Sequence, residues 1–309
     1  MKAAGIFEGG GIKGLAHLGA VEVMEDAGYR WERLAGTSAG SIVATLLAAG
    51  YTGKELIELF SHFPYEQLQR KTAISHLPLI GSWLSLYIYN GIYKLSILEK
   101  WLNQVLSKKG VLTFGDLPPN KLKIVISDIS NNRMAILPDD LTRYGLQAAT
   151  FPLALAVRIS SSIPFYFLPV HLKKHTFLDG SILSNYPVWI FDKDSLPSYP
   201  TFGFRLSGPT IVPQPEQIRG PVSKTLAIVR TMMDARDSRY IEENDAVRTI
   251  FVNNINVGTT DFTIPEEKRL ELIELGREAS RKFLKKWDYH HYIKTYHTSI
   301  APQLSPKIK

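Results

Sequence analysis

A serine between two glycines is the first feature of this 309-residue chain whose type and spacing suit chemistry. Residues 36–40 read Gly-Thr-Ser-Ala-Gly, the G-x-S-x-G spacing of a nucleophile on a sharp turn from a strand into a helix. At such a turn the Ser38 hydroxyl points outward beside a helix N-terminus, where backbone amides and the helix dipole stabilise developing negative charge. An apolar run precedes the motif and a helical pattern follows it, which favours a nucleophile over a serine that only caps a helix.

A glycine-rich stretch, Gly9-Gly10-Gly11-Ile12-Lys13-Gly14, follows the first apolar run and opens a helical pattern. Bare backbone amides at such a turn can hold an anion, and in acyl transfer they would stabilise an oxyanion. The same letters match the dinucleotide fingerprint G-x-G-x-x-G. That fold requires an acidic residue at the end of the second strand, however, and this strand ends in Gly36-Thr37-Ser38. A dinucleotide-binding oxidoreductase is therefore a weak alternative.

The third candidate is Asp179, which is followed by Gly180 and stands at the end of a predicted strand. An acidic residue there suits a catalytic carboxylate on a loop, although Asp-Gly alone is a common turn dipeptide. The order of the glycine loop, G-x-S-x-G, the run Val157 to Pro164 and Asp179-Gly180 resembles the patatin-like phospholipase family. The resemblance extends from Gly5 to about Pro187.

That resemblance implies a Ser-Asp dyad without histidine, in which Ser38 is the nucleophile and Asp179 the base. It also implies that the amides of Gly10 and Gly11 form the oxyanion hole, supported by glycines at five further positions: Gly9, Gly14, Gly36, Gly40 and Gly180. The implied activity is lipid acyl hydrolysis of the phospholipase A or lysophospholipase type, through an acyl-enzyme and without a cofactor or metal. One departure is Ser181, where the family prefers glycine or alanine.

The predicted elements alternate between strands and helices, which is typical of an α/β fold. The resemblance specifies a three-layer sandwich with a central, mainly parallel sheet flanked by helices. We expect a single domain over residues 1–309, with a motif-bearing core of about 5–187 and a C-terminal helical part of about 265–290. Strands are predicted at 3–7, 33–35, 121–127, 134–137, 165–171, 176–178, 201–206 and 249–253, and helices at about 15–27, 42–49, 54–60, 96–106 and 265–287.

Two further alternatives stay open. A Ser-Asp-His triad of the α/β-hydrolase type would take its histidine from three near the C-terminus: His290, His291 and His297. A catalytically inactive scaffold on the same fold is the other. His17 is expected to pack in the core, and the adjacent pairs Asp139-Asp140 and Glu242-Glu243 do not converge on a metal ion.

Composition restricts the setting. The net charge of +7 attracts nucleic acid and anionic lipid alike, but no Lys/Arg block is interleaved with aromatic residues. We therefore expect no nucleic-acid partner, and a peripheral contact with anionic membranes. Glu8 interrupts the N-terminal apolar run too early for a signal peptide, which favours the cytoplasm. For the apolar segment 77–93 a buried core is favoured, while a lid or a docking surface stays open. Preferred lipid and oligomeric state are left open.

Overall fold

The computed structural model describes residues 1–71, 81–192, 197–206 and 243–295, together with residues 224, 227 and 231. The helices are α1 (Leu15–Asp26), α2 (Ala39–Ala48), α3 (Gly53–Ser61), α4 (Gly81–Tyr89), α5 (Ser96–Lys108), α6 (Leu153–Ser160), α8 (Glu243–Ala246) and α9 (Glu266–Leu284). The strands are β1 (Lys2–Phe7), β2 (Arg30–Thr37), β3 (Leu122–Asp128), β4 (Arg133–Leu137), β5 (Val170–Leu172), β6 (His175–Asp179), β7 (Thr201–Arg205) and β8 (Thr249–Phe251).

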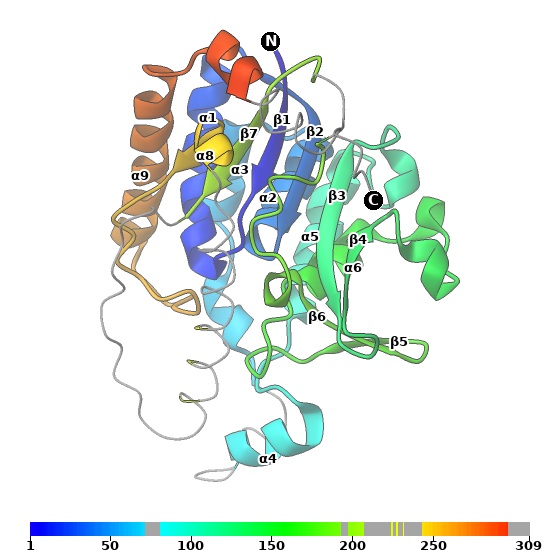
Figure 1. Cartoon of the computed structure of the whole chain (residues 1–309). Coiled ribbons are helices and arrows are strands. Elements are labelled where there is room, and N and C mark those ends of the chain that lie inside the picture. The colour runs from blue at the N-terminus through cyan, green and yellow to red at the C-terminus, as the bar shows by residue number, and fades with distance from the viewer. Residues whose placement is uncertain are drawn as a thin grey trace, which may run out of the picture.

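These strands form one mixed sheet in the order β5-β6-β3-β2-β1-β7-β8, with β4 also paired to β3. The strands from β3 to β8 in that order run parallel, whereas β4 and β6 pair antiparallel to β3. Helices flank the sheet (Figure 1), so the expected α/β architecture with a mainly parallel central sheet is confirmed. β1 and β2 run from the end of the molecule marked N toward the end where α4 lies.

The core follows the two-residue period of the strands. Phe7, Leu34 and Ile124 face one side of the sheet and join the main apolar cluster with residues of the helices. Their neighbours Ile6, Ala35 and Val125 face the other side and pack against Ile190. Each strand therefore buries both faces, which explains why the sequence shows short continuous apolar runs there rather than alternation.

The long C-terminal helix α9 packs lengthwise against α1 (Figure 1). Glycine permits this approach, since a β-carbon added at Gly276 would lie 1.8 Å from the Ala16 carbonyl oxygen. Gly19 of α1 is equally close to the Ile273 carbonyl oxygen of α9. A segment some 250 residues from the N-terminus thus stabilises the helix that follows the glycine loop.

Two predictions need correction. The strand expected at 165–171 is confined to Val170–Leu172, because Pro164 and Pro169 lack amide donors and Phe165 takes a positive φ of 63°. In the segment 77–93, residues 77–80 lie outside the described part, and α4 ends in side chains that are exposed. The core interpretation is therefore wrong for the end of α4. No helix in the described ranges is both long and apolar enough to cross a membrane.

Candidate active site

Ser38 lies on the turn between β2 and α2, as the G-x-S-x-G motif predicts. Its φ of 51° and ψ of −125° place it in a conformation that non-glycine residues rarely adopt. Strain of this kind persists only where the surroundings hold it, and it is found preferentially at functional sites. The hydroxyl of Ser38 donates a hydrogen bond to Oδ2 of Asp179, with 2.7 Å between the two oxygens.

Asp179 ends β6 and has no solvent-exposed surface. Its second oxygen, Oδ1, accepts hydrogen bonds from the amide of Ser181 at 2.9 Å and from the Ser181 hydroxyl at 2.6 Å. Burial raises the pKa of Asp179 to about 6, because desolvation disfavours the charged form more than the hydrogen bonds from Ser181 and Ser38 favour it. The carboxylate is thus a stronger base than an exposed aspartate, yet it is mostly ionised at neutral pH.

Two neighbouring serines at the end of α6 also contribute, and the sequence assigned them no role. The Ser160 hydroxyl accepts a hydrogen bond from the Ser38 amide at 2.9 Å and donates one to the Val125 carbonyl at 2.7 Å. Ser160 therefore connects the Ser38 turn to β3. The hydroxyl of Ser161 is buried and has no hydrogen-bond partner among the described residues. The only signal for either serine was their position in the polar run that precedes Pro164.

The glycine loop leads from β1 into α1 through a short 3₁₀ turn, Gly11–Gly14. The amides of Gly10 and Gly11 donate to no acceptor in the described part of the chain, whereas the amide of Ile12 donates to the Thr259 carbonyl at 3.1 Å. Gly11 has a φ of 57°, and a β-carbon on it would lie 1.9 Å from the same carbonyl oxygen. Glycine is therefore required at this position, and the Thr259 carbonyl packs against the glycine loop at Gly11 and Ile12.

The five supporting glycines lie where neighbouring segments touch. A β-carbon added at any of them would come within 2.2 to 2.8 Å of another atom: at Gly9, Gly14, Gly36, Gly40 and Gly180. At Gly40 that atom is the carbonyl oxygen of Phe7, which ends β1. The Ser38 turn, the glycine loop and the Asp179 turn can be packed together because these positions lack side chains.

Beneath the glycine loop, buried Glu8 links β1 to β7. Its carboxylate accepts a hydrogen bond from the Leu206 amide and lies 3.5 Å from the Arg205 guanidinium, while its backbone carbonyl lies 2.8 Å from Nε2 of His17. Burial lowers the pKa of His17 to about 4, so this imidazole is neutral at physiological pH. His17 thus occupies the core, in contact with the Phe7 ring.

A pocket of about 610 Å³, including open space at its mouth, begins at Ser38 and follows the first turns of α2. Its polar lining includes Ser38 and Ser161. Its walls are mainly aliphatic and aromatic, and include Ile42, Val43, Phe60, Phe63, Leu68, Leu95, Leu98, Ile163, Phe167 and Phe262. Walls of this apolar character suit a flexible hydrocarbon chain whose polar end lies at the serine.

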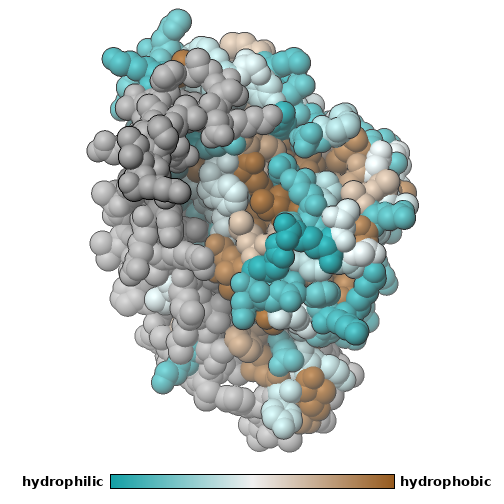
Figure 2. Space-filling model, turned by 45° about the vertical axis from the view of Figure 1, so that its right-hand side comes forward, coloured by the Kyte–Doolittle hydropathy of each residue, from teal (hydrophilic) through white to brown (hydrophobic). Residues whose placement is uncertain are grey.

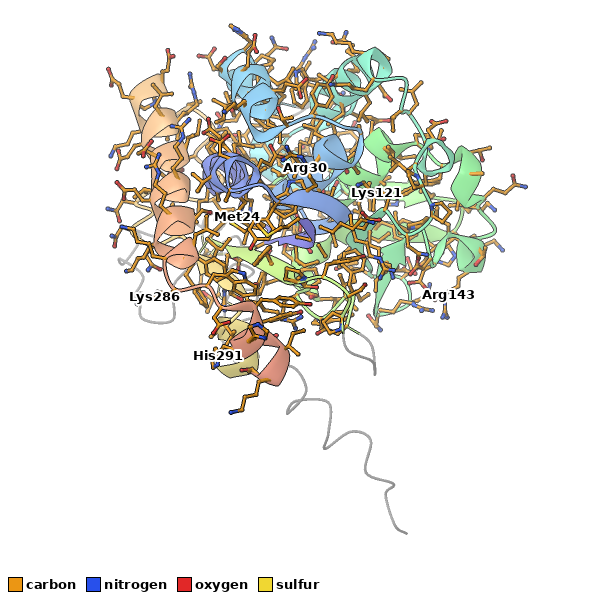
Figure 3. All side chains as sticks on the ribbon, turned by 90° about the horizontal axis from the view of Figure 1, so that it is seen from above. Met24, Arg30, Lys121, Arg143, Lys286 and His291 are labelled. Carbon is orange, nitrogen blue, oxygen red and sulfur yellow. The ribbon has the colours of Figure 1, made fainter. Side chains whose placement is uncertain are left out.

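The triad alternative finds no geometric support in the described residues, where no histidine hydrogen bonds to Ser38 or Asp179. His290 and His291 are exposed, and Figure 3 places His291 at the periphery, on the helical turn that follows α9. His297 and Glu242 lie outside the described residues. Within the described ranges no three His, Asp or Glu side chains are grouped so as to hold a metal ion.

Comparison with known proteins adds the decisive observation. The family model "Patatin-like phospholipase" matches residues 5–192, more than half of the chain. The chain belongs to the patatin-like phospholipase family. Membership supports the hydrolysis of lipid esters, and it does not favour the oxidoreductase, triad or scaffold alternatives.

Two proteins similar in sequence to this chain differ in how much of their own length the chain covers. The chain is 42% identical to the uncharacterized protein YqhO of Bacillus subtilis over 290 residues, covering 92% of this chain and 99% of YqhO. It is 22% identical to the uncharacterized NTE family protein Mb2594 of Mycobacterium bovis, covering 90% of this chain but only 46% of that protein.

Solved structures show the same fold at low identity. VipD of Legionella pneumophila aligns over 92% of this chain and 67% of its own, with a TM-score of 0.57 and 18% identity. The type III effector ExoU aligns over 92% of this chain and 53% of its own, with a TM-score of 0.50 and 16% identity. Because each alignment covers 92% of the chain, the shared fold extends beyond the residues 5–192 that the family model matches.

Proposed function

We propose that this chain hydrolyses the carboxylic esters of phospholipids or lysophospholipids with a Ser38–Asp179 dyad. The observation that carries the proposal is the 2.7 Å hydrogen bond from the Ser38 hydroxyl to the buried Asp179 carboxylate, at the entrance of an apolar pocket. A nucleophile hydrogen-bonded to a base of raised pKa is the arrangement that acyl transfer requires.

In the first half-reaction, Ser38 Oγ attacks the ester carbonyl carbon while Asp179 Oδ2 accepts the hydroxyl proton. The carbonyl oxygen becomes an oxyanion. In this proposal the amides of Gly10 and Gly11, which donate to no acceptor in the described part of the chain, stabilise that charge. Each such donor is worth roughly 3 kcal/mol in other acyl-transfer enzymes. When the ester bond breaks, Asp179 returns the proton to the departing alcohol and the acyl group stays on Ser38.

In the second half-reaction, water replaces the alcohol. Asp179 accepts a proton from the water as its oxygen attacks the acyl-enzyme, and the same proton then returns to Ser38 Oγ as the fatty acid leaves. The acyl chain would occupy the pocket along α2, where Ile42 and Val43 follow the nucleophile. No step in this scheme needs a metal ion or cofactor.

Fluorophosphonate labelling with peptide mass mapping tests the dyad. We expect one adduct, on Ser38, with none in Ser38→Ala and a labelling rate at least about 100-fold lower in Asp179→Asn. Ser162→Ala is the matched control, since Ser162 is buried nearby but its hydroxyl donates to the Arg158 carbonyl. An adduct on another serine, or wild-type labelling of Asp179→Asn, would contradict the proposal.

Release of fatty acid from defined lipids tests the substrate class. The wild-type protein should release fatty acid from phosphatidylcholine or lysophosphatidylcholine, and Ser38→Ala should release none. If the labelled enzyme cleaves only short soluble esters, the dyad stands but the lipid substrate is wrong.

A further inference from the structure

The end of α4 exposes apolar side chains in a way that the rest of the described surface does not. Tyr87 is 87% exposed, Ile88 48% and Tyr89 42%, in three consecutive positions. Ser85 of the same helix is buried instead, and its hydroxyl donates to the carbonyl of Gly91, just beyond the helix, at 2.7 Å. Figure 1 shows α4 projecting from the body of the molecule, and Figure 2 shows apolar side chains at that lower tip.

A fourth apolar side chain lies beside this helix. Phe165 is 37% exposed and adopts a positive φ of 63°, which is unfavourable for an aromatic residue. Its neighbour Tyr166 accepts hydrogen bonds through its carbonyl from the amides of Ile92 and Tyr93, just after α4. Phe165 therefore lies on a segment that is hydrogen-bonded to the residues just after α4, and its phenyl ring is partly exposed although burial would be favoured by the hydrophobic effect.

Three exposed cations, Arg70, Lys71 and Lys94, lie on the segments that adjoin the residues just after α4. The Lys94 amide donates to the Arg70 carbonyl at 3.1 Å, and Lys71 forms a β-bridge with Tyr93, so the three basic residues lie on adjoining backbone segments. None of them forms an ion pair with an acidic side chain in the described part of the chain. All three side chains are exposed, so they can contact an external anion.

The same segments line the pocket. Leu68 precedes Arg70, Leu95 follows Lys94, and Ile163 and Phe167 stand on either side of Phe165; all four contribute to the pocket wall. The carboxyl ends of β1 and β2, which carry the glycine loop and Ser38, also point toward this end of the molecule (Figure 1). The segments that carry Phe165 and the three cations therefore also contribute to the wall of the proposed lipid-binding cavity.

We propose that Tyr87, Ile88, Tyr89 and Phe165, the apolar tip, together with Arg70, Lys71 and Lys94, the basic rim, form a docking surface for anionic lipid bilayers. Tyrosine rings suit the membrane–water interface, aliphatic and phenyl groups enter the acyl boundary, and the cations face anionic headgroups. We favour an anionic bilayer over a protein partner because exposed basic residues lie on the segments that adjoin the apolar tip. The orientation of the pocket toward the membrane rests on the proposed function, whereas bilayer binding itself does not.

Co-sedimentation with vesicles tests the docking surface without turnover. The full chain carrying Ser38→Ala is mixed with vesicles of phosphatidylcholine, or of equal parts phosphatidylcholine and phosphatidylglycerol. We expect binding to the anionic vesicles only. Replacing Tyr87, Ile88 and Tyr89 together by serine should weaken it at least about tenfold.

The matched control replaces three exposed apolar residues elsewhere by serine, namely Leu112, Leu270 and Tyr289. It should bind as the parent does. If this control weakens binding as much as the tip variant does, or if the tip variant binds unchanged, the apolar tip is not the docking surface.

Neutralising the basic rim by Arg70→Gln, Lys71→Gln and Lys94→Gln should weaken binding to anionic vesicles by about 100-fold, since each basic residue near such a surface contributes about fivefold. The control makes the same change in net charge at the C-terminal end of α9, which lies at the end of the molecule opposite α4 (Figure 1), by neutralising three exposed lysines: Lys282, Lys285 and Lys286. Equal losses of vesicle binding in the two variants would show a general effect of net charge and would contradict a specific role for the basic rim.

Light scattering tests whether a second copy of this chain, rather than a bilayer, covers the surface. If the parent protein is a dimer, the tip variant is a monomer and vesicle binding is unchanged, the surface binds a second copy and the proposal is wrong. Failure of vesicle binding with intact labelling of Ser38 would overturn the docking surface alone. Vesicle binding that depends on the tip, with no labelling of Ser38, would overturn the proposed function alone.

Discussion

Ser181 donates two hydrogen bonds to the Asp179 carboxylate, from its amide at 2.9 Å and from its hydroxyl at 2.6 Å. Both go to Oδ1, which leaves Oδ2 for Ser38. Ser181 is also the position at which the chain departs from the glycine or alanine of the family pattern. The departure therefore places an additional donor on the proposed base, and it fixes the plane of the carboxylate relative to the nucleophile.

The first prediction concerns the pH dependence of hydrolysis. Asp179 accepts a proton only when ionised, and burial raises its pKa to about 6. We therefore expect kcat/KM to be constant above about pH 7 and to fall tenfold per pH unit well below pH 6. A stopped assay with a soluble ester measures this profile. A limb near pH 4 would mean that Asp179 is solvated or is not the base.

The second prediction concerns Ser181→Ala. Losing the hydroxyl donor removes a hydrogen bond that favours the ionised form, so the pKa of Asp179 should rise and the acidic limb of kcat/KM should move to higher pH. At pH 6 the variant should be slower than wild type, and at pH 8 the two should converge. Ser162→Ala is the control and should leave the limb in place. An equal loss at every pH would indicate a structural role only.

The third prediction concerns the stability of Asp179→Asn. The folded-state pKa near 6 exceeds the ordinary value of 3.8, so the folded protein binds a proton more tightly than the unfolded chain. The Asp179 contribution to the free energy of unfolding therefore falls as pH rises from about 4 to about 6, and it is lowest above that range. The side-chain amide in the variant Asp179→Asn does not ionise, so its contribution to the free energy of unfolding does not fall as pH rises. At pH 8 the variant should be more stable by up to roughly 3 kcal/mol, with little difference at pH 4.

Thermal or urea unfolding of both proteins at several pH values tests this relationship. Because the comparison is between wild type and Asp179→Asn, titration of other groups such as His17 cancels. A variant that is equally destabilised at pH 4 and pH 8 would show that the amide disrupts packing.

The fourth prediction contrasts two adjacent serines. Ser160→Ala leaves the Ser38 amide without its partner, so we expect destabilisation of about 1–3 kcal/mol and a lower kcat. Ser161→Ala removes a buried hydroxyl that has no partner among the described residues, so stability should be unchanged or higher. Because Ser161 lines the pocket beside Ser38, its loss should raise KM for lipids. Chemical denaturation and steady-state kinetics on both variants distinguish these roles.

The fifth prediction concerns the length of the acyl chain. Ile42 is half-buried on the pocket side of α2, and Ile42→Phe would occupy space that we assign to the acyl chain. Hydrolysis of long-chain esters should fall at least about tenfold relative to short-chain esters. Ile57→Phe, at a half-buried position of α3 outside the pocket wall, is the control. Equal losses for both chain lengths would place the acyl group elsewhere.

Much of this site was predictable because its parts are short and local. The Ser38 turn, the glycine loop and Asp179 each depend on a few adjacent residues, and the central strands are continuous apolar runs. Ser160 and Thr259 were not predictable, since each contacts its target across more than 100 residues and has no distinctive neighbours. The exposure of Tyr87 was missed because apolar content does not tell an outward-facing helix end from a buried one.

The contact of the Thr259 carbonyl with the glycine loop bears on whether the motif-bearing part of the chain could be passed on by recombination without the rest. Residues 5–192 contain every side chain that we assign to bond making and breaking, and a fragment of that length would look complete by its motifs. It would nevertheless lack β7 and the Leu206 amide that follows it, which donates to the Glu8 carboxylate. It would also lack the Thr259 carbonyl, which accepts a hydrogen bond from the Ile12 amide. We therefore expect that residues 5–192 cannot be exchanged between proteins as an independent unit. Recombination of that part alone would transfer the reactive side chains without the segments beyond residue 192 that position the glycine loop.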